Sequence, residues 1–194
     1  MARWEADASG RLQRAAIELF AQQGFTETTV PQIAVRAGVT TRTFFRHFPD
    51  KREVLFAGEE GLATTFADLI DTAPSELAAL GTLEHALKAA ADEGFEQRRD
   101  WMRQWRAIVN AEHPLRERGL SKQQMLVTAA VKALRKRGVD PVTGELAAGM
   151  ALVAFQAAAA EWVADEAATR PLSSYLEVSF SHVRQVAAAD HLRM

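Results

Sequence analysis

Between Thr29 and Pro49 the sequence places two very short helical segments side by side, and this arrangement restricts the folds open to the chain more than any other feature. Thr29 and Gln32 have the spacing of a capping box at the start of the first segment. Gly38 is placed to end that segment, and Thr40 to cap the next one. Two short helices joined by a glycine-containing turn predict a helix-turn-helix.

The rest of the chain has apolar residues at helical spacing and lacks alternating β-branched runs. We therefore expect an all-α fold. Besides the two short segments, the predicted helices cover roughly residues 12–23, 51–70, 82–98, 100–111, 115–137, 141–166 and 172–189. Gly58 and Gly61 are the points at which the second of these could loosen.

The composition excludes several kinds of catalytic and metal-binding site. The 194 residues are 48% hydrophobic and 25% charged, which is typical of a folded globular protein. The chain has no cysteine, which excludes disulfides, cysteine nucleophiles and thiolate metal sites. Its five histidines are scattered without paired metal-ligand spacing, and no serine-nucleophile motif is present. We therefore expect neither a metal site nor an enzyme.

Charge is distributed unevenly although the net value is only −2. Residues 1–52 contain eight lysines and arginines against five acids, while the remainder is net acidic. A positive N-terminal quarter favours contact with a polyanion at that end. The longest apolar run, 150–160, is interrupted by Gln156 and followed by Glu161, so we expect no membrane span.

The second short helix has one face suited to nucleic acid. Thr41, Arg42, Phe45 and Arg46 cluster on the side opposite the apolar anchor Phe44. Guanidinium groups, a hydroxyl and an aromatic ring are groups that contact base edges and phosphates in the major groove. The spacing alone is equally compatible with arginines that solvate the outer face of an amphipathic helix.

The particular residues of segment 10–56 carry a more specific signal. They include the stretches GF at 24–25, TVPQIA at 29–34, AGVT at 37–40 and TFFRHFPDK at 43–51. This segment resembles the DNA-binding domain of the TetR family of bacterial transcriptional regulators. The resemblance implies a cytoplasmic bacterial homodimer that represses at a palindromic operator. It also implies a DNA-binding domain at 1–55 and a ligand-binding and dimerisation domain at 56–194.

The resemblance also assigns contacts position by position. The residues expected to approach bases or phosphates are Thr29, Thr40, Thr41, Arg42, Thr43, Phe45, Arg46, His47 and Lys51. Two of them depart from the usual family pattern, which has tyrosine at the position of Phe45 and often glycine at that of Arg42. Phe45 lacks the hydroxyl that would meet a phosphate but can still touch a thymine methyl group.

The last two helices are expected to pair with a second subunit, as the resemblance implies. The residues predicted at this interface are Ala157, Leu172, Leu176, Phe180 and Val183. The same stripe at helical spacing also fits ordinary packing inside one chain.

A set of large side chains on successive helices suggests an effector cavity. The predicted ligand-binding residues are Trp101, Arg103, Trp105, Met125, Phe155, Gln156 and Trp162. Four arginines in segment 98–106 either solvate a surface or bind an anionic head group. A second resemblance is to the branch of the family with acyl-coenzyme-A-like ligands, and it rests on residues 42–46, 115–116, 137–141 and 162. It would account for an apolar cavity with arginine at its mouth. We expect a small hydrophobic effector of this kind and no cofactor.

The function expected from these features is a ligand-responsive repressor that releases its operator when the effector binds. Two alternatives remain at this point. One is a helical small-molecule or lipid-binding protein without operator binding, and the other is an all-helical enzyme that uses the C-terminal cavity. The outward arginines Arg42 and Arg46 favour the DNA-binding function, because neither alternative needs them.

Overall fold

All regular structure in the described part of the chain is helical, which confirms the all-α prediction. The computed structural model describes residues 2–95, 98–167 and 170–189. These residues form two compact units. Unit 1 comprises Met1–Glu59 and Trp101–Lys122, and unit 2 comprises Glu60–Asp100 and Gln123–Met194. The N-terminal unit thus includes a second segment from the middle of the chain, while the predicted division into functional domains at residue 55 stays a prediction.

Unit 1 is built around one apolar core. Its elements are α1 (Ala2–Gln23), α2 (Val30–Arg36), α3 (Thr41–His47), the 3₁₀ helix η1 (Glu53–Phe56), most of α6 (Arg99–Ala111) and the first ten residues of α7 (His113–Lys136). Leu12 of α1, Ile33 of α2 and Phe44 of α3 are fully buried in this core. Burial of these side chains fixes how the short helices sit on α1, because helices of seven residues are not stable alone.

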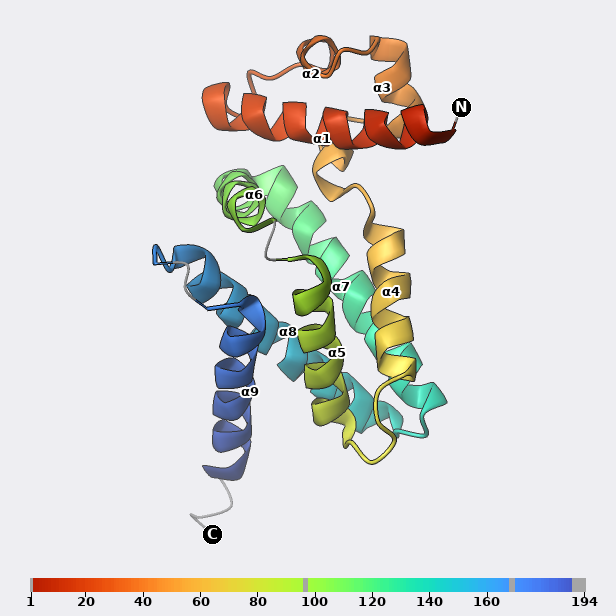
Figure 1. Cartoon of the computed structure of the whole chain (residues 1–194), viewed down its shortest axis with the longest axis vertical. Helices are drawn as coiled ribbons and strands as arrows, with labels where there is room; N and C mark the ends of the chain where they lie inside the picture. The colour runs from red at the N-terminus through yellow and green to blue at the C-terminus, as the bar shows by residue number, and fades with distance from the viewer. Residues whose placement is uncertain (1, 96–97, 168–169, 190–194) are drawn as a thin grey trace. The chain divides into compact units, whose positions relative to one another are not determined.

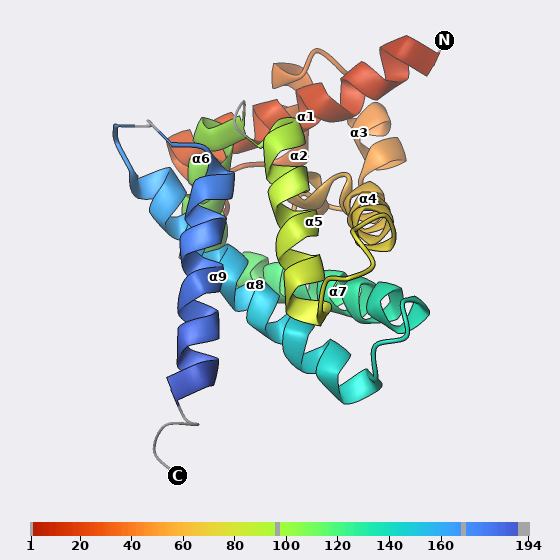
Figure 2. The same cartoon turned by 60° about the horizontal axis from the view of Figure 1, so that its bottom comes forward.

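Unit 2 is a bundle whose central element is rich in small residues. It contains α4 (Glu59–Asp71), α5 (Ala79–Gly94), the rest of α7, α8 (Pro141–Ala164) and α9 (Leu172–Ala189). α8 packs along α9, and both pack on α5 (Figures 1 and 2). The buried face of α8 is mostly glycine and alanine. Such short side chains let neighbouring helices approach closely. The small residues of this face are Gly144, Ala147, Ala148, Ala151, Ala154, Ala158 and Ala159, and Trp162 is its one large member among those described.

One arginine holds the loop after α4 in unit 2. The guanidinium of Arg137 donates to the backbone carbonyls of Ile70, Asp71, Ala73 and Pro74, at 3.2, 3.3, 2.8 and 2.7 Å. These carbonyls lie in the last turn of α4 and just after it, where the helix itself supplies no donors. Arg137 therefore clamps a connection more than sixty positions earlier in the chain.

Most observed helix ends lie within a few residues of the predicted ones, but α1 begins at Ala2, ten residues earlier than predicted, and α5 covers Ala79–Gly94 in place of 82–98. Asp140 caps α8 as expected, since its carboxylate accepts from the backbone N–H of Thr143 at 3.0 Å. The single helix predicted over 51–70 is wrong, because the chain forms η1, turns, and then begins α4. Gly58 causes the break with a φ of +84°, a conformation that strains other residues.

By length and composition, α8 is apolar enough to cross a bilayer, and no other described helix passes that test. The central helix of a water-soluble bundle passes the same test, and 44% of the apolar window of α8 is buried inside the protein. This property is therefore weak evidence for a membrane span.

Candidate nucleic-acid interface

The start of α2 has the capping box predicted from its sequence. Gln32 donates its backbone N–H to the hydroxyl of Thr29 at 3.4 Å, and Thr29 donates its own N–H to the side-chain oxygen of Gln32 at 2.8 Å. Both side chains are exposed. Thr29 is therefore the N-cap of α2. Its approach to a phosphate stays a prediction.

The start of α3 is fixed by the turn before it and by its own cap. Gly38 has a φ of +68°, and the N–H of Val39 returns to the carbonyl of Ala34 at 2.9 Å. The hydroxyl of Thr40 accepts from the N–H of Thr43 at 3.1 Å. These bonds close the helix-turn-helix and set the direction of α3 relative to α2.

α3 presents one polar and aromatic face to solvent. Arg42, Phe45 and Arg46 are exposed on it, and the ring of Phe45 is 55% exposed. Phe44, which is fully buried, anchors the opposite face and meets the Phe45 ring edge-on at 5.5 Å. Thr41 and Thr43 are half-buried at the margins of the exposed face. An exposed arginine pair around a ring matches the chemistry predicted for major-groove contact.

Lys51 lies in a different environment from the one predicted. Its ammonium donates to three backbone carbonyls of the loop between α1 and α2, those of Phe25, Thr26 and Thr28, at 2.7, 3.2 and 2.9 Å. It also lies 4.3 Å from the centre of the Phe25 ring. A lysine ammonium has three N–H donors, and here the loop takes all three. Direct donation to a phosphate would break one of these bonds, so the structure makes Lys51 a loop clamp.

His47 is half-buried next to Phe48, with ring centres 6.2 Å apart. Its Nε2 atom is buried and has no hydrogen-bond partner among the described residues. A phosphate could reach this atom only if the side chain rotated outward. Its predicted phosphate contact therefore stays a prediction that now requires this rotation.

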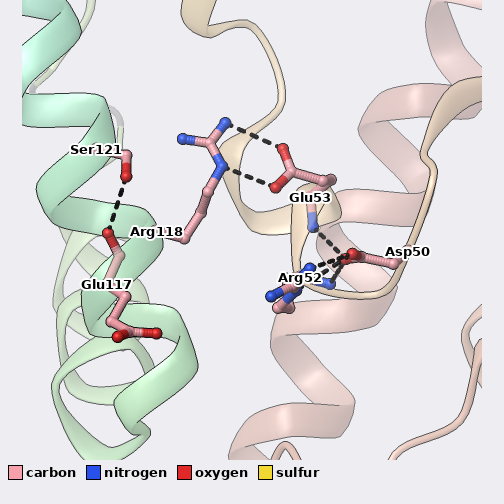
Figure 3. A network of polar contacts seen from close by, with 6 residues as sticks. All are labelled: Asp50, Arg52, Glu53, Glu117, Arg118 and Ser121. Atoms are coloured by element: carbon pink, nitrogen blue, oxygen red, sulfur yellow. Dashed lines mark hydrogen bonds and ion pairs between the residues drawn. The ribbon is translucent and has the colours of Figure 1, made fainter.

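A network that sequence reasoning missed ties η1 to α7 within unit 1 (Figure 3). Arg118 donates to both carboxylate oxygens of Glu53, at 2.7 and 3.0 Å, and its guanidinium lies 4.9 Å from the Phe56 ring centre. Beside this pair, the Asp50 carboxylate accepts from the Arg52 side chain, which holds the pKa of Asp50 below its ordinary value. The partners in the ion pair are 65 positions apart, so no local signal could have revealed it.

The predicted effector residues are not brought together as one set. Trp101 and Trp105 stack on each other at 6.2 Å and pack against the core of unit 1. The indole N–H of Trp105 donates to the carbonyl of Leu55 at 2.9 Å, and its ring meets Phe56 edge-on. These two tryptophans therefore support the helix-turn-helix core, and Arg103 on the same helix is exposed.

The other predicted effector residues belong to unit 2. Met125 and Gln156 are half-buried, and Phe155 packs edge-on against Phe95 with ring centres 6.1 Å apart. Trp162 has no exposed surface. The guanidinium carbon of Arg99 lies 5.5 Å from the centre of the Trp162 ring. The sequence singles out Arg99 only as one of four arginines in segment 98–106.

The residues predicted at the dimer interface fall into two groups. Leu172, Leu176 and Phe180 have no exposed surface, so the structure places them in the core of their own chain rather than where a second copy could reach them. Ala157 is exposed and Val183 is half-buried. The exposed apolar side chains of α8 lie elsewhere, at Val142, Leu146, Met150 and Val153.

Comparison with known proteins supports this view of the N-terminal helices. Residues 12–57 match the family described as bacterial regulatory proteins, tetR family. The transcriptional regulator TcmR of Streptomyces glaucescens is 38% identical over 79 residues, which cover 41% of this chain and 35% of TcmR. The chain spans about a third of the length of the curated relatives it matches.

Solved structures resemble the whole chain. FadR of Thermus thermophilus, a TetR-family repressor solved with lauroyl-CoA, has a TM-score of 0.56 at 24% identity and covers 90% of this chain and 92% of its own. SmeT, solved with triclosan, has a TM-score of 0.58 at 17% identity, with 92% and 90% covered. At these identities the likeness concerns the fold. The family match therefore concerns residues 12–57, and the likeness of the remaining helices to these solved structures is a likeness of fold.

Proposed function

We propose that this protein is a ligand-responsive transcriptional regulator that binds an operator through α3. The observation that carries the proposal is the exposed face of α3, where Arg42 and Arg46 flank the 55%-exposed ring of Phe45 on a capped helix-turn-helix. Arginine can bond guanine O6 and N7 together, and the phenyl ring can contact a thymine methyl group. Within the family this unit binds DNA, and the curated relative TcmR is a transcriptional regulator.

The proposed form is a cytoplasmic bacterial homodimer on a palindromic operator. Support comes from a row of exposed apolar side chains on α8, whose members recur every three or four residues and so share one face. The row consists of Val142, Leu146, Met150, Val153 and Ala157. An apolar row of this length is typical of an association surface. It replaces Leu172, Leu176 and Phe180 as the proposed contact with the second copy.

The proposed effector is a small molecule with an apolar part, because proteins of similar fold were solved with lauroyl-CoA and with triclosan. An acyl-CoA-like molecule is the finer form of this proposal. For the effector to release DNA, it must bind more tightly to the conformation that does not fit the operator. A ligand with equal affinity for both conformations would leave repression unchanged.

The test is selection of bound sequences from random DNA duplexes by the purified protein. Enrichment of a palindrome supports operator binding. The variant Arg42→Ala should then relax the preference at one position in each half-site, at a cost of about 1–3 kcal/mol. Arg36→Ala is the matched control, because the Arg36 guanidinium is already paired with Glu18 at 3.0 Å.

The same selection tests the proposed dimer. Leu146→Glu places a charge in the exposed α8 row and should yield single half-sites in place of palindromes. If the purified protein enriched no sequence, and Arg42→Ala and the parent protein retained random DNA equally well, operator binding would be refuted. The alternative of a helical binding protein without an operator would then stand.

A further inference from the structure

One aromatic ring on the outer face of α3 is left uncovered by the fold. Among the side chains that the structure describes, Phe45 is the one exposed aromatic group, with 55% of its surface open to solvent. Its neighbour Phe44 is fully buried and meets the Phe45 ring edge-on, with 5.5 Å between the ring centres and 83° between the ring planes. The Phe45 ring is therefore held against the core on one side, and its remaining surface faces solvent.

Two guanidinium groups share this face with the ring. Arg42 precedes Phe45 by three residues and Arg46 by four, and both arginines are exposed. Residues three or four apart are neighbours on the surface of an α-helix, so Arg42 lies beside both Phe45 and Arg46. The positive charge favours contact with the phosphates of DNA, and a recognition helix places such a face in the major groove.

The spacing along α3 sets how far apart the two contacts fall on the DNA. The rise of an α-helix from Arg42 to Phe45 is about 4.5 Å, and successive base pairs of DNA are about 3.4 Å apart. When α3 lies in the major groove, the ring and the Arg42 guanidinium therefore reach base pairs no more than about two steps apart.

The chemistry of the ring restricts what it can face in the groove. Every base pair presents hydrogen-bond donors or acceptors there, and the C5 methyl of thymine is the one apolar group on the four unmodified bases. Against a polar base edge, a phenyl ring would displace water without replacing the lost hydrogen bonds, which disfavours binding. Against a thymine methyl group, it would remove two apolar surfaces from water, which favours binding.

We propose that Phe45 is a specificity-determining residue that selects a C5-methylated pyrimidine in each operator half-site, close to the guanine bound by Arg42. This inference rests on the proposed function and adds to it a defined chemical group on the DNA. 5-Methylcytosine carries its methyl group at the same ring position as thymine, so methylation of a cytosine at this place should strengthen binding. The competing explanation is that the ring only packs on Phe44 and touches no base.

The experiment removes one methyl group from the DNA and leaves the protein unchanged. The sequence enriched from random duplexes is prepared with each thymine in turn replaced by deoxyuridine, which lacks only the C5 methyl. For the parent protein, affinity should fall about threefold to fivefold at one thymine in each half-site, as expected when a single buried methyl group is lost. Replacing that T·A pair by C·G should weaken binding at least as much, and 5-methylcytosine in place of the new cytosine should recover part of the loss.

Phe45→Ala completes the comparison on the side of the protein. Because Phe45 is exposed, this variant should fold normally, and it should bind the thymine and deoxyuridine duplexes equally well. Phe45→Tyr keeps the ring and should keep the preference of the parent protein. Leu120→Ala is the matched control, because it removes a 63%-exposed apolar side chain from α7, outside the helix-turn-helix, and should also keep the preference.

The outcomes separate this inference from the proposed function. The role of Phe45 would be refuted if the parent protein bound every deoxyuridine duplex as tightly as the thymine duplex, or if Phe45→Ala discriminated between them as the parent does. An enriched half-site that contained no thymine would have the same meaning. Each of these results leaves operator binding intact, because a sequence has been enriched. Enrichment of no sequence at all would instead refute operator binding, on which the inference depends.

Discussion

The turns of the helix-turn-helix are held by side chains a few positions away in the sequence, whereas the loops of unit 2 are held by side chains far away in the sequence. In the helix-turn-helix, Thr29 and Thr40 each bond a backbone N–H three positions later. In unit 2, Arg137 bonds carbonyls more than sixty positions earlier, and Arg99 bonds the end of α8 from a similar separation. A cap that bonds its neighbours can form in a partly unfolded chain, whereas a distant clamp exists only after folding. We therefore expect removal of a distant clamp to cost more.

The largest effect should come from Arg137→Ala. This change leaves the carbonyls of Ile70, Ala73 and Pro74 without their donors, together with that of Asp71. Bonds from a charged donor contribute about 1.5–3 kcal/mol, and water can replace only part of them at this half-buried position. The free energy of unfolding should fall by about 3 kcal/mol, as measured by chemical denaturation.

Lys136→Ala is the control for this prediction. Lys136 is the neighbouring cation and pairs with Asp71 at 3.0 Å, but its side chain is 59% exposed. Exposed pairs of this kind contribute less than about 1 kcal/mol. Lys136 and Arg137 both reach back more than sixty positions, so equal losses would mean that a half-buried clamp contributes no more than an exposed ion pair, and the large cost expected for Arg137→Ala would be refuted.

The difference between local caps and distant clamps also explains which features the sequence could predict. The two short helices, their caps at Thr29 and Thr40, and the turn at Gly38 were all predictable, because each depends on residues within a few positions. The cap at Asp140 was predictable for the same reason. Helical periodicity was also enough to give the all-α class and most helix ends.

The partners of long side chains were not predictable. Trp105 and Trp162 are both large side chains predicted on the apolar face of a helix, yet Trp105 donates to Leu55 in unit 1 and Trp162 is buried in unit 2. Periodicity shows that a face is apolar but not which neighbour covers it. For this reason the apolar stripe of the last helix predicts an interface role for Phe180, which is fully buried within its own chain, and periodicity gives no sign of the Glu53–Arg118 pair.

An intermediate effect is expected for Lys51→Met, which removes a distant clamp on the loop that precedes α2. Methionine keeps an apolar side chain over the Phe25 ring but donates to none of the three loop carbonyls. Unfolding free energy should fall by about 2 kcal/mol. Operator affinity should also fall, because the loop positions α2, but the slope of its logarithm against the logarithm of salt concentration should not change.

That slope separates a loop clamp from a phosphate contact. A lysine that neutralises a phosphate releases counterions, and its loss lowers the slope by about one for each subunit. Arg46→Met, on the exposed face of α3, is the comparison expected to lower it. A reduced slope for Lys51→Met would restore the phosphate contact predicted from the sequence.

The smallest effect is expected at Asp50, which acts locally. Its carboxylate accepts from the backbone N–H groups of Arg52 and Glu53, at 2.7 and 3.2 Å, just before η1. The Arg52 side chain also donates to it, and this bond is the main reason that the Asp50 pKa lies below its ordinary value of 3.8. Asp50→Asn keeps the shape and removes the charge, so it should cost less than Lys51→Met when unfolding is measured near neutral pH.

The pH dependence of this cost identifies its cause. Because folding lowers the pKa of Asp50, the ionised carboxylate stabilises the fold above the ordinary value of 3.8, and that contribution is lost as the pH falls through the lowered pKa. The difference in unfolding free energy between the parent and Asp50→Asn should therefore shrink toward zero in acid. Arg137 bonds backbone carbonyls, which do not titrate, so the loss in Arg137→Ala should persist over the same range. If the Asp50→Asn difference stayed constant with pH, the local cap would act through its shape and not through its charge, and the pairing of Asp50 with Arg52 would contribute nothing to stability.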